Sequence, residues 1–354
     1  AALKEASDAG WWQPHLLRPA PGKSPRVMMM TSGNPMRRNR SGAHLLPKHL
    51  FPKLKMMYAI EPRMSASALY CDIILPAAWY YEKTDMTVSI TANPRFVFIE
   101  QAVNPPGECK PEWEIYGAIL KRVGEIAAER GLEDYGDHFG QRRAYADLWN
   151  RYTFDGKVVT QDQALTEMIA VATATGILPA DTTVESFRKA GMIPQQGFGT
   201  GFMKHLVAND YSADKPFFSL AWHVDKKVTY PTYTRRAQFY LDHPWYMEAG
   251  EALPVHKEPP KIGGDHPFAI TGGHPRHSIH SLHLNVPQLM RLHRAQPVMH
   301  MNDRAAKERG IADGERVRVF NDFSDFEIMV RTSPTVAPTQ VVVYFWENPQ
   351  FKDW

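Results

Sequence analysis

Hydrophobic positions in the first part of the chain gather in short apolar runs. The runs are RVMMMTSGNP at 26–35, KLKMMYAIEP at 53–62 and ALYCDIILPAA at 68–78. Each has the length of a buried strand and ends near small, acidic or prolyl residues, as parallel strands do when they lead into loops. The pattern predicts an α/β domain with an open sheet of Rossmann type. Ligands of such sheets bind at the carboxyl ends of the strands.

A long helix and a loop-rich stretch follow these runs. The segment at 111–131 predicts a helix because its apolar positions form one stripe. Residues 132–260 have a mixed pattern, with short helices such as QDQALTEMIAVATATG. Within this stretch, TRRAQFYLDHPW at 234–245 predicts a strand that ends in a turn.

The pattern becomes that of a β protein after the Pro- and Lys-rich segment 254–267. FAITGG, ERVRVFND, DFEIMVRTSP and TQVVVYFWEN predict short strands, and Asn302 and Gly310 are the expected caps of one short helix. Such elements predict a small closed β-barrel. We therefore divide the chain into a linker at 1–25, an α/β domain portion at 26–150, a loop-rich interdomain region at 151–260 and a C-terminal β-barrel at 261–354.

Composition narrows the classes of function. The chain of 354 residues has 41 Lys and Arg against 38 Asp and Glu, and it lacks a long basic run, so we expect no nucleic-acid partner. No apolar run approaches the ~18 residues of a membrane span. The GxGxxG and GxxxxGK[ST] fingerprints are absent, which disfavours a conventional nucleotide-binding dehydrogenase. Cys71 and Cys109 are too few for an iron–sulfur cluster, and Cys71 is expected to be an inert core thiol.

Histidines recur every third position in ITGGHPRHSIHSLH, at His274, His277, His280 and His283. On a helix this spacing drifts by about 60° per step, so four imidazoles do not converge on one zinc ion. A strand that ends in Thr-Gly-Gly and continues into Arg276 exposes backbone N–H groups beside a guanidinium. This arrangement favours a large anionic ligand such as a pterin or a pyrophosphate. His277 and His283 are expected to face elsewhere.

The segment 271–281 resembles the molybdopterin-contacting segment of the dimethyl sulfoxide reductase family of molybdenum enzymes. DRAAKERGIADGERVRVFND at 303–322 is similar to the family's C-terminal barrel, and residues 58–87 are similar to a run in its α/β domain. The resemblance covers most of 26–350 in consecutive order. It looks closest to the branch of ethylbenzene and steroid dehydrogenases, dimethyl sulfide dehydrogenase, and nitrate and selenate reductases. It implies the C-terminal portion of a catalytic (alpha) subunit, inactive alone.

The resemblance implies molybdenum held by two molybdopterin guanine dinucleotides, one in the α/β part and one in the barrel. The ligand of the metal and a [4Fe–4S] cluster are expected in an N-terminal part outside this chain, so no catalytic residue or metal ligand is assigned here. The implied cofactor contacts are Asn34, Glu61, Arg63, Ser65, Glu82, Lys83, Asp85, Thr271, Gly272, Gly273, His274, Arg276, Ile279, His280 and Ser281. The alternatives are a solvated loop acid for Glu61 and a surface ion pair for Glu82, Lys83 and Asp85.

The activity that this resemblance implies is oxygen-atom transfer. We favour water-dependent hydroxylation of a hydrocarbon or steroid C–H bond; the alternatives are reduction of an oxyanion such as nitrate, selenate or chlorate, and a non-catalytic scaffold that keeps the fold. The implied partners are the N-terminal part of the same subunit, an iron–sulfur electron-transfer subunit and a haem subunit. The family branch implies a periplasmic location, and otherwise the cytoplasm is expected.

Overall fold

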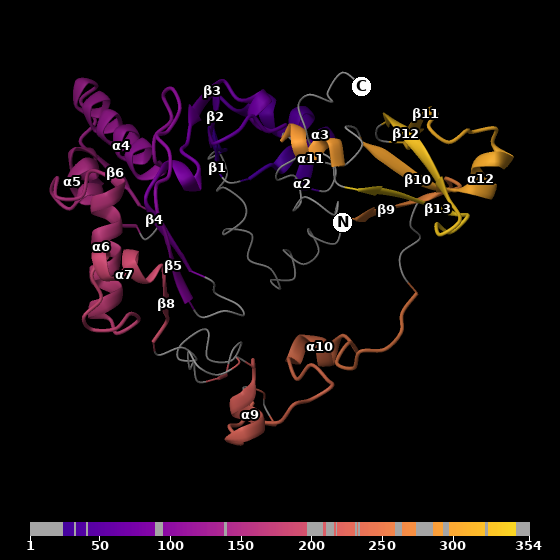
Figure 1. Ribbon diagram of the computed structural model, residues 1–354. Helices are drawn as coiled ribbons and strands as arrows, with labels where there is room; N and C mark the ends of the chain where they lie inside the picture. The colour runs from indigo at the N-terminus through magenta and orange to yellow at the C-terminus, as the bar shows by residue number, and fades with distance from the viewer. Residues whose placement is uncertain are drawn as a thin grey trace. The chain divides into compact units, whose positions relative to one another are not determined.

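The computed structural model describes residues 24–31, 33–39, 42–88, 95–137, 140–196, 208–209, 216, 218–230, 232, 234–258, 264–273, 286–292, 297–322 and 325–344. Figure 1 shows the helices and strands along the chain. The chain divides into two compact units. The first unit joins Ala1–Leu75 to Glu258–Trp354, and the second is Pro76–Lys257. Within the described residues, no helix is both long and apolar enough to cross a membrane.

The N-terminal sheet of the first unit has the order β1-β2-β3, formed by Val27–Thr31, Met56–Glu61 and Ile73–Pro76. β1 and β2 are parallel, as predicted, and their register runs from Val27–Met56 to Thr31–Ile60. The connection between them contains short helices: α2 (Pro35–Arg38), α3 (Gly42–Leu45), η2 (Leu46–Leu50) and η3 (Phe51–Lys53), whereas η4 (Ala68–Tyr70) precedes β3. A buried cluster that includes Met30, Met57 and Ala59 holds the sheet together.

The C-terminal sheet of the first unit is mixed and has the order β11-β12-β10-β13-β9. Its strands are β9 (Ala269–Gly273), β10 (Val298–Asn302), β11 (Arg316–Phe320), β12 (Asp325–Ser333) and β13 (Gln340–Tyr344), with helices α11 (Pro287–Leu292) and α12 (Asp303–Glu308). The predicted strands are thus confirmed. Because no pairing of β9 with β11 is found among the described residues, closure into a barrel stays a prediction.

Helix α12 begins as the sequence predicts. The side chain of Asn302 accepts hydrogen bonds from the backbone N–H groups of Arg304 (3.0 Å) and Ala305 (3.1 Å), which confirms its role as N-cap. Gly310 follows the helix with a φ of +69°, a conformation that glycine adopts without strain. Ala305 and Ala306 of this helix pack on the apolar face of the C-terminal sheet, beside Met301.

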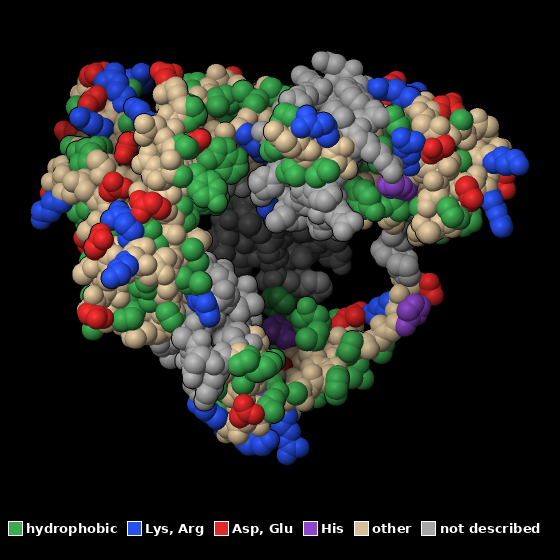
Figure 2. All heavy atoms as spheres, in the orientation of Figure 1, with side chains coloured by type: hydrophobic (Ala, Val, Ile, Leu, Met, Phe, Trp, Pro, Cys, Tyr) green, Lys and Arg blue, Asp and Glu red, His purple; other side chains and the backbone are tan. Residues whose placement is uncertain are grey.

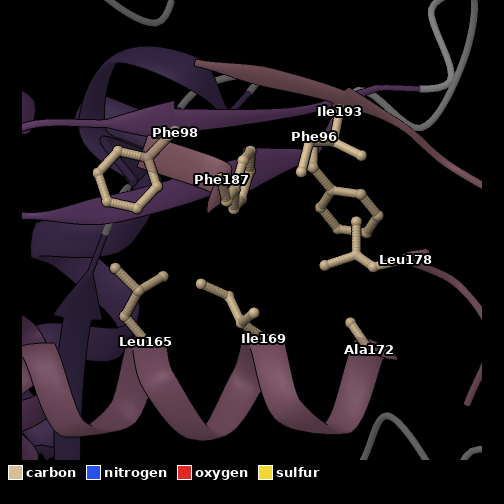
Figure 3. Packing of buried hydrophobic residues seen from close by; sticks show 8 residues of the cluster. All are labelled: Phe96, Phe98, Leu165, Ile169, Ala172, Leu178, Phe187 and Ile193. Atoms are coloured by element: carbon tan, nitrogen blue, oxygen red, sulfur yellow. The ribbon is translucent and has the colours of Figure 1, made fainter. Parts of the chain in front are cut away.

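The second unit packs helices on a small antiparallel sheet of order β4-β5-β8. Phe98, Phe187 and Leu165 belong to the cluster between the sheet and the helices, and the rings of Phe98 and Phe187 meet edge-on at 5.3 Å (Figure 3). The elements of this layer are β4 (Asp85–Val88), β5 (Arg95–Ile99), β8 (Met192–Pro194), α6 (Gln161–Ala174) and α7 (Val184–Ala190).

The predicted helix at 111–131 is α4 (Glu112–Glu129), and it packs beside α5 (Leu148–Thr153). The ring of Tyr152 stacks on Trp113 at 4.3 Å, and its hydroxyl donates to the Trp113 carbonyl (2.9 Å). Burial raises the pKa of Tyr152 to about 12. The remaining short elements are η5 (Tyr80–Glu82), β6 (Asp134–Gly136), β7 (Arg142–Ala144), η6 (Tyr145–Asp147), α9 (Ala221–Asp225) and α10 (Pro244–Glu248).

The strand predicted at 234–245 is wrong. These residues lie in turns and irregular chain, and α10 begins at Pro244, where the ring fixes the first helical φ. Phe239, in the middle of the predicted strand, is 90% exposed. Figure 2 shows apolar side chains at the surface in the region of α10. The alternation of apolar residues failed as a signal because a strand also needs a neighbour to pair with, and none pairs here among the described residues.

Candidate cofactor-binding site

Two loops leave the same edge of the N-terminal sheet. Because β1 and β2 are parallel and end at the register pair Thr31–Ile60, the residues that follow each strand lie at one edge. Asn34 follows β1 as the residue before α2, and Glu61 is the last residue of β2. The structure therefore brings together two of the loops in which sequence analysis placed cofactor contacts.

A buried serine joins these two loops. Ser67 is 0% exposed, and its hydroxyl donates to Asn34 Oδ1 (2.6 Å) and accepts from the backbone N–H of Met36 (3.0 Å). The other side-chain atom of the Asn34 amide, Nδ2, is buried and has no hydrogen-bond partner among the described residues. An unsatisfied buried donor costs about 1–3 kcal/mol, so this amide is poised for an oxygen that the described chain does not supply.

Ser65 has a structural role that sequence analysis did not foresee. It is 2% exposed, and its hydroxyl oxygen accepts a hydrogen bond from Ala68 N–H (3.1 Å), which fixes the turn into η4. Glu61 and Arg63 are half-buried. Contact of Glu61, Arg63 and Ser65 with a nucleotide stays a prediction.

The thiol of Cys71 lies beside this turn. It is half-buried, and its Sγ donates to the Ser67 carbonyl oxygen at 3.8 Å. Burial raises the pKa of the Cys71 thiol, and the charges of Asp72 and Glu61 raise it further. The thiol is therefore protonated at neutral pH, which agrees with the expectation of an unreactive cysteine.

Glu82, Lys83 and Asp85 lie in the second unit, and each makes contacts within the protein. Lys83 is 8% exposed and pairs with Asp85 (3.3 Å) and with Glu112 at the start of α4. Glu82 accepts a hydrogen bond from Trp79 N–H (2.8 Å) and so closes the turn η5. The surface ion pair considered from sequence is thus a partly buried one: Lys83 is buried, whereas the two carboxylates are partly exposed. Contact of these three residues with a cofactor stays a prediction.

In the C-terminal sheet, Thr271, Gly272 and Gly273 end strand β9, as the sequence indicates. Gly273 lies opposite Tyr344 of β13, and a Cβ at this position would approach Tyr344 Cε1 to 2.5 Å. Glycine is therefore required here by the neighbouring ring. The Thr271 hydroxyl donates to the Val341 carbonyl oxygen (3.4 Å). Their contact with a cofactor stays a prediction.

Strand register places two further polar residues in line with Thr271. Arg331, His300, Val342 and Thr271 are successive partners across β12, β10, β13 and β9, so their side chains share one face of the sheet. The apolar cluster occupies the opposite face. Arg331 Nη1 donates to Asp313 Oδ2 (2.9 Å), whereas its Nε has no partner among the described residues. Sequence analysis missed this row because strands far apart in sequence form it.

The remaining predicted contacts lie outside the described residues. They are His274, Arg276, Ile279, His280 and Ser281, together with His277 and His283. The structure therefore tests neither the pterin assignment of this segment nor the zinc alternative. In the part of the chain that is described, no group of His, Cys, Asp or Glu side chains has the arrangement of a metal site.

Comparison with known families identifies the class of both sheets. Residues 268–350, which contain the C-terminal sheet, match the molybdopterin dinucleotide binding domain. Residues 20–122, which contain the N-terminal sheet, match the molybdopterin oxidoreductase family. The chain thus combines two domains of molybdopterin dinucleotide enzymes. It belongs to the molybdopterin oxidoreductases. This is the dimethyl sulfoxide reductase family, which the sequence analysis named as the resemblance.

Individual relatives extend this similarity over nearly the whole chain. The respiratory nitrate reductase alpha subunit of Haloferax mediterranei is 32% identical over 363 residues, covering 99% of this chain and 36% of that protein. The perchlorate reductase alpha subunit of Dechloromonas aromatica is 34% identical over 339 residues, covering 94% of this chain and 34% of that protein. The chain spans about a third of the length of these relatives.

Among solved structures, acetylene hydratase from Pelobacter acetylenicus has a similar fold. The TM-score is 0.53 at 16% identity, covering 90% of this chain and 37% of that protein. The comparison shows the fold alone.

The residues at the edge of the N-terminal sheet fit a molybdopterin dinucleotide. Its phosphates, riboses and pterin are rich in oxygen acceptors, and Asn34 Nδ2 is a buried donor without a partner among the described residues. Open sheets of parallel strands bind their ligands at this same edge. At this edge, Asn34 therefore offers a donor that fits the oxygens of the cofactor.

Proposed function

We propose that this chain is the dinucleotide-binding part of a molybdenum-dependent reductase of an inorganic oxyanion. The proposal that the chain binds this cofactor rests on one observation, the match of its two domains to molybdopterin families. The two relatives described above, which act on nitrate and perchlorate, support the substrate class. The comparisons favour this alternative over the hydroxylation of a hydrocarbon or steroid that the sequence analysis preferred.

When bound, a molybdopterin cofactor supplies a metal that exchanges electrons in pairs while an oxygen atom is transferred. The residues of this chain would bind and orient the dinucleotide. Asn34 would donate from Nδ2 to one of its oxygens, and the backbone of Gly272 would allow close approach near the end of β9. The side chains that follow Gly273 would supply donors to the second dinucleotide, as the resemblance implies.

The test uses the full-length gene product, purified without oxygen. Molybdenum and released guanine nucleotide are measured per protein, and dye-linked turnover is measured with nitrate, chlorate, perchlorate and selenate against ethylbenzene and a steroid. We expect bound molybdenum and turnover of at least one oxyanion. Turnover of the hydrocarbon or steroid alone would refute the substrate class, and a protein free of molybdenum and pterin would support a scaffold instead.

We further propose an iron–sulfur electron-transfer subunit and a haem subunit as partners, and a periplasmic location. These proposals rest on the family resemblance. Co-purification from the native membrane and periplasmic fractions tests both: a protein recovered from the cytoplasm without any subunit would refute them.

A further inference from the structure

The direction of the hydrogen bonds around Ser67 is determined by their chemistry. The Met36 N–H group donates to the Ser67 hydroxyl oxygen. The single proton of that hydroxyl is then left for Asn34 Oδ1, which lies 2.6 Å away and accepts it. The oxygen of the Asn34 amide is thus held by Ser67, and the NH₂ group is turned away from it.

The turn that carries Ser67 is itself rigid. Its carbonyl oxygen accepts from Tyr70 N–H (3.1 Å), and the neighbouring Ser65 accepts from Ala68 N–H through its hydroxyl. Ser67 is fully buried, so its hydroxyl is shielded from bulk water. A buried, satisfied donor of this kind fixes the rotamer of the group that it contacts.

We infer that Ser67 is a positioning residue for the cofactor: it holds the Asn34 amide so that Nδ2 donates to an oxygen of the bound dinucleotide. This inference rests on the proposed cofactor. With the amide reversed, Oδ1 would face the oxygens of the ligand and repel them. Ser67 therefore selects the orientation in which the loop after β1 presents a donor.

The alternative is a purely structural role, in which Ser67 only holds the turn at Met36. The two roles differ in a double-mutant cycle. If Ser67 acts through Asn34, its removal has no further effect once Asn34 is gone. If it acts by holding the turn, the two substitutions have additive effects on binding.

The experiment measures binding of molybdenum-free molybdopterin guanine dinucleotide to the cofactor-free full-length protein, without oxygen. We expect Asn34→Ala and Ser67→Ala each to raise Kd about three- to tenfold, the loss of one oriented hydrogen bond, and the double variant to match Asn34→Ala. Asn34→Asp keeps the bond from Ser67 but presents an anionic oxygen, so it should bind more weakly than Asn34→Ala.

Thr153→Val is the matched control. Thr153 is 1% exposed, and its hydroxyl also donates one bond, to Trp149 O (2.7 Å), and accepts one, from Gly156 N–H (3.0 Å), but it belongs to the second unit. The Kd of Thr153→Val for the dinucleotide should equal that of the wild type. If Ser67→Ala does not fold, Ser67→Cys keeps the volume with a weaker donor, and the same weakening of binding is expected.

The outcomes separate the inference from the proposed function. An unchanged Kd for Ser67→Ala with a weakened Asn34→Ala overturns the role of Ser67 and leaves the cofactor site intact, as do additive effects. An unchanged Kd for Asn34→Ala removes the cofactor contact itself, and the role of Ser67 with it. Binding of Asn34→Asp as tight as the wild type would mean that the amide is oriented the other way.

Discussion

Replacement of Lys83 by Met removes one charge from the buried group that ties the chain before β4 to the start of α4. The methionine keeps the length of the side chain, so the change is mainly electrostatic. Lys83 is 8% exposed, whereas Asp85 is 21% and Glu112 is 37% exposed. The two carboxylates thus lose their cation but retain part of their hydration.

The size of the effect follows from this partial burial. Removing one partner of a fully buried pair costs about 3–5 kcal/mol, and an exposed pair contributes about 0–1 kcal/mol. For two half-exposed carboxylates we expect about 2–3 kcal/mol, discounted for solvent screening. In a unit of this size, that lowers the unfolding midpoint by about 4–12 °C.

The assay combines thermal unfolding, followed by far-ultraviolet circular dichroism, with hydrogen exchange of the first turn of α4. Lys257→Met is the control, because Lys257 forms an ion pair with Glu251 while both are more than 40% exposed. The free energy of unfolding of Lys257→Met should stay within about 0.5 kcal/mol of that of the wild type. The reasoning is refuted if Lys83→Met and Lys257→Met unfold at the same temperature.

The pH dependence of the Lys83 effect has a definite sign. Burial lowers the pKa of Lys83, but the hydrogen bond and charge of Glu112, with those of Asp85, raise it by more, and the net pKa is raised. A raised pKa adds stability that is complete below the unfolded value, about 10.4, and is lost as the pH rises through the folded value. The difference between wild type and Lys83→Met should therefore be constant at neutral pH and shrink above about pH 10.

Four further predictions concern single side chains. Because burial raises the pKa of Tyr152 to about 12, its contribution to stability is lost as the pH rises from about 10 to 12, and tyrosinate absorbance should show one late transition that Tyr152→Phe abolishes. Phe187→Ala removes a ring that is 0% exposed and leaves a cavity, so it should lower the free energy of unfolding of the second unit by about 3–5 kcal/mol, measured in urea. A decrease below about 1 kcal/mol would contradict the tight packing of this ring. Gly273→Ala should lower the midpoint of the first unit because its Cβ meets the Tyr344 ring, and Tyr344→Ala should relieve the loss; no relief would show that the ring is not the obstacle. His223 Nδ1 lies 2.7 Å from a backbone carbonyl, which only accepts, so the ring should be the Nδ1–H tautomer in ¹⁵N spectra at neutral pH, and signals of the Nε2–H tautomer would exclude this bond.

Local patterns predicted the regular elements well where a helix forms its hydrogen bonds within itself, as α4 does, or where a strand has a pairing partner, as β11 has in β12. The stripe of α4 and the alternation of Val317 and Val319 in β11 give their own periodicity, and the cap at Asn302 needs only its neighbours in sequence. The segment around Phe239 has the same alternation but pairs with no strand among the described residues. Periodicity alone does not report the presence of a pairing partner, and this is why that prediction failed.

The polar contacts of the candidate site were beyond such patterns because they join residues far apart in sequence. Ser67 meets Asn34 across 33 positions, and Lys83 meets Glu112 across 29. A serine in RMSASALY and a lysine in YYEKTD look like ordinary loop residues until the fold buries them. The strand ends indicated where the loop after β1 would lie, but only the three-dimensional structure shows which atom of Asn34 is left for a ligand.

Ser67 and Lys83 are both buried polar side chains at points where a loop joins regular structure. A buried hydrogen bond or ion pair is stabilising only when every member is satisfied, so such loops have few alternative conformations. A loop already fixed in this way loses little conformational entropy when a ligand binds, which increases affinity. The Ser67 hydroxyl both donates and accepts a hydrogen bond, whereas Asn34 Nδ2 has no partner among the described residues. The hydrogen-bonded part of this network thus presents the Asn34 NH₂ group at the sheet edge where a dinucleotide is expected.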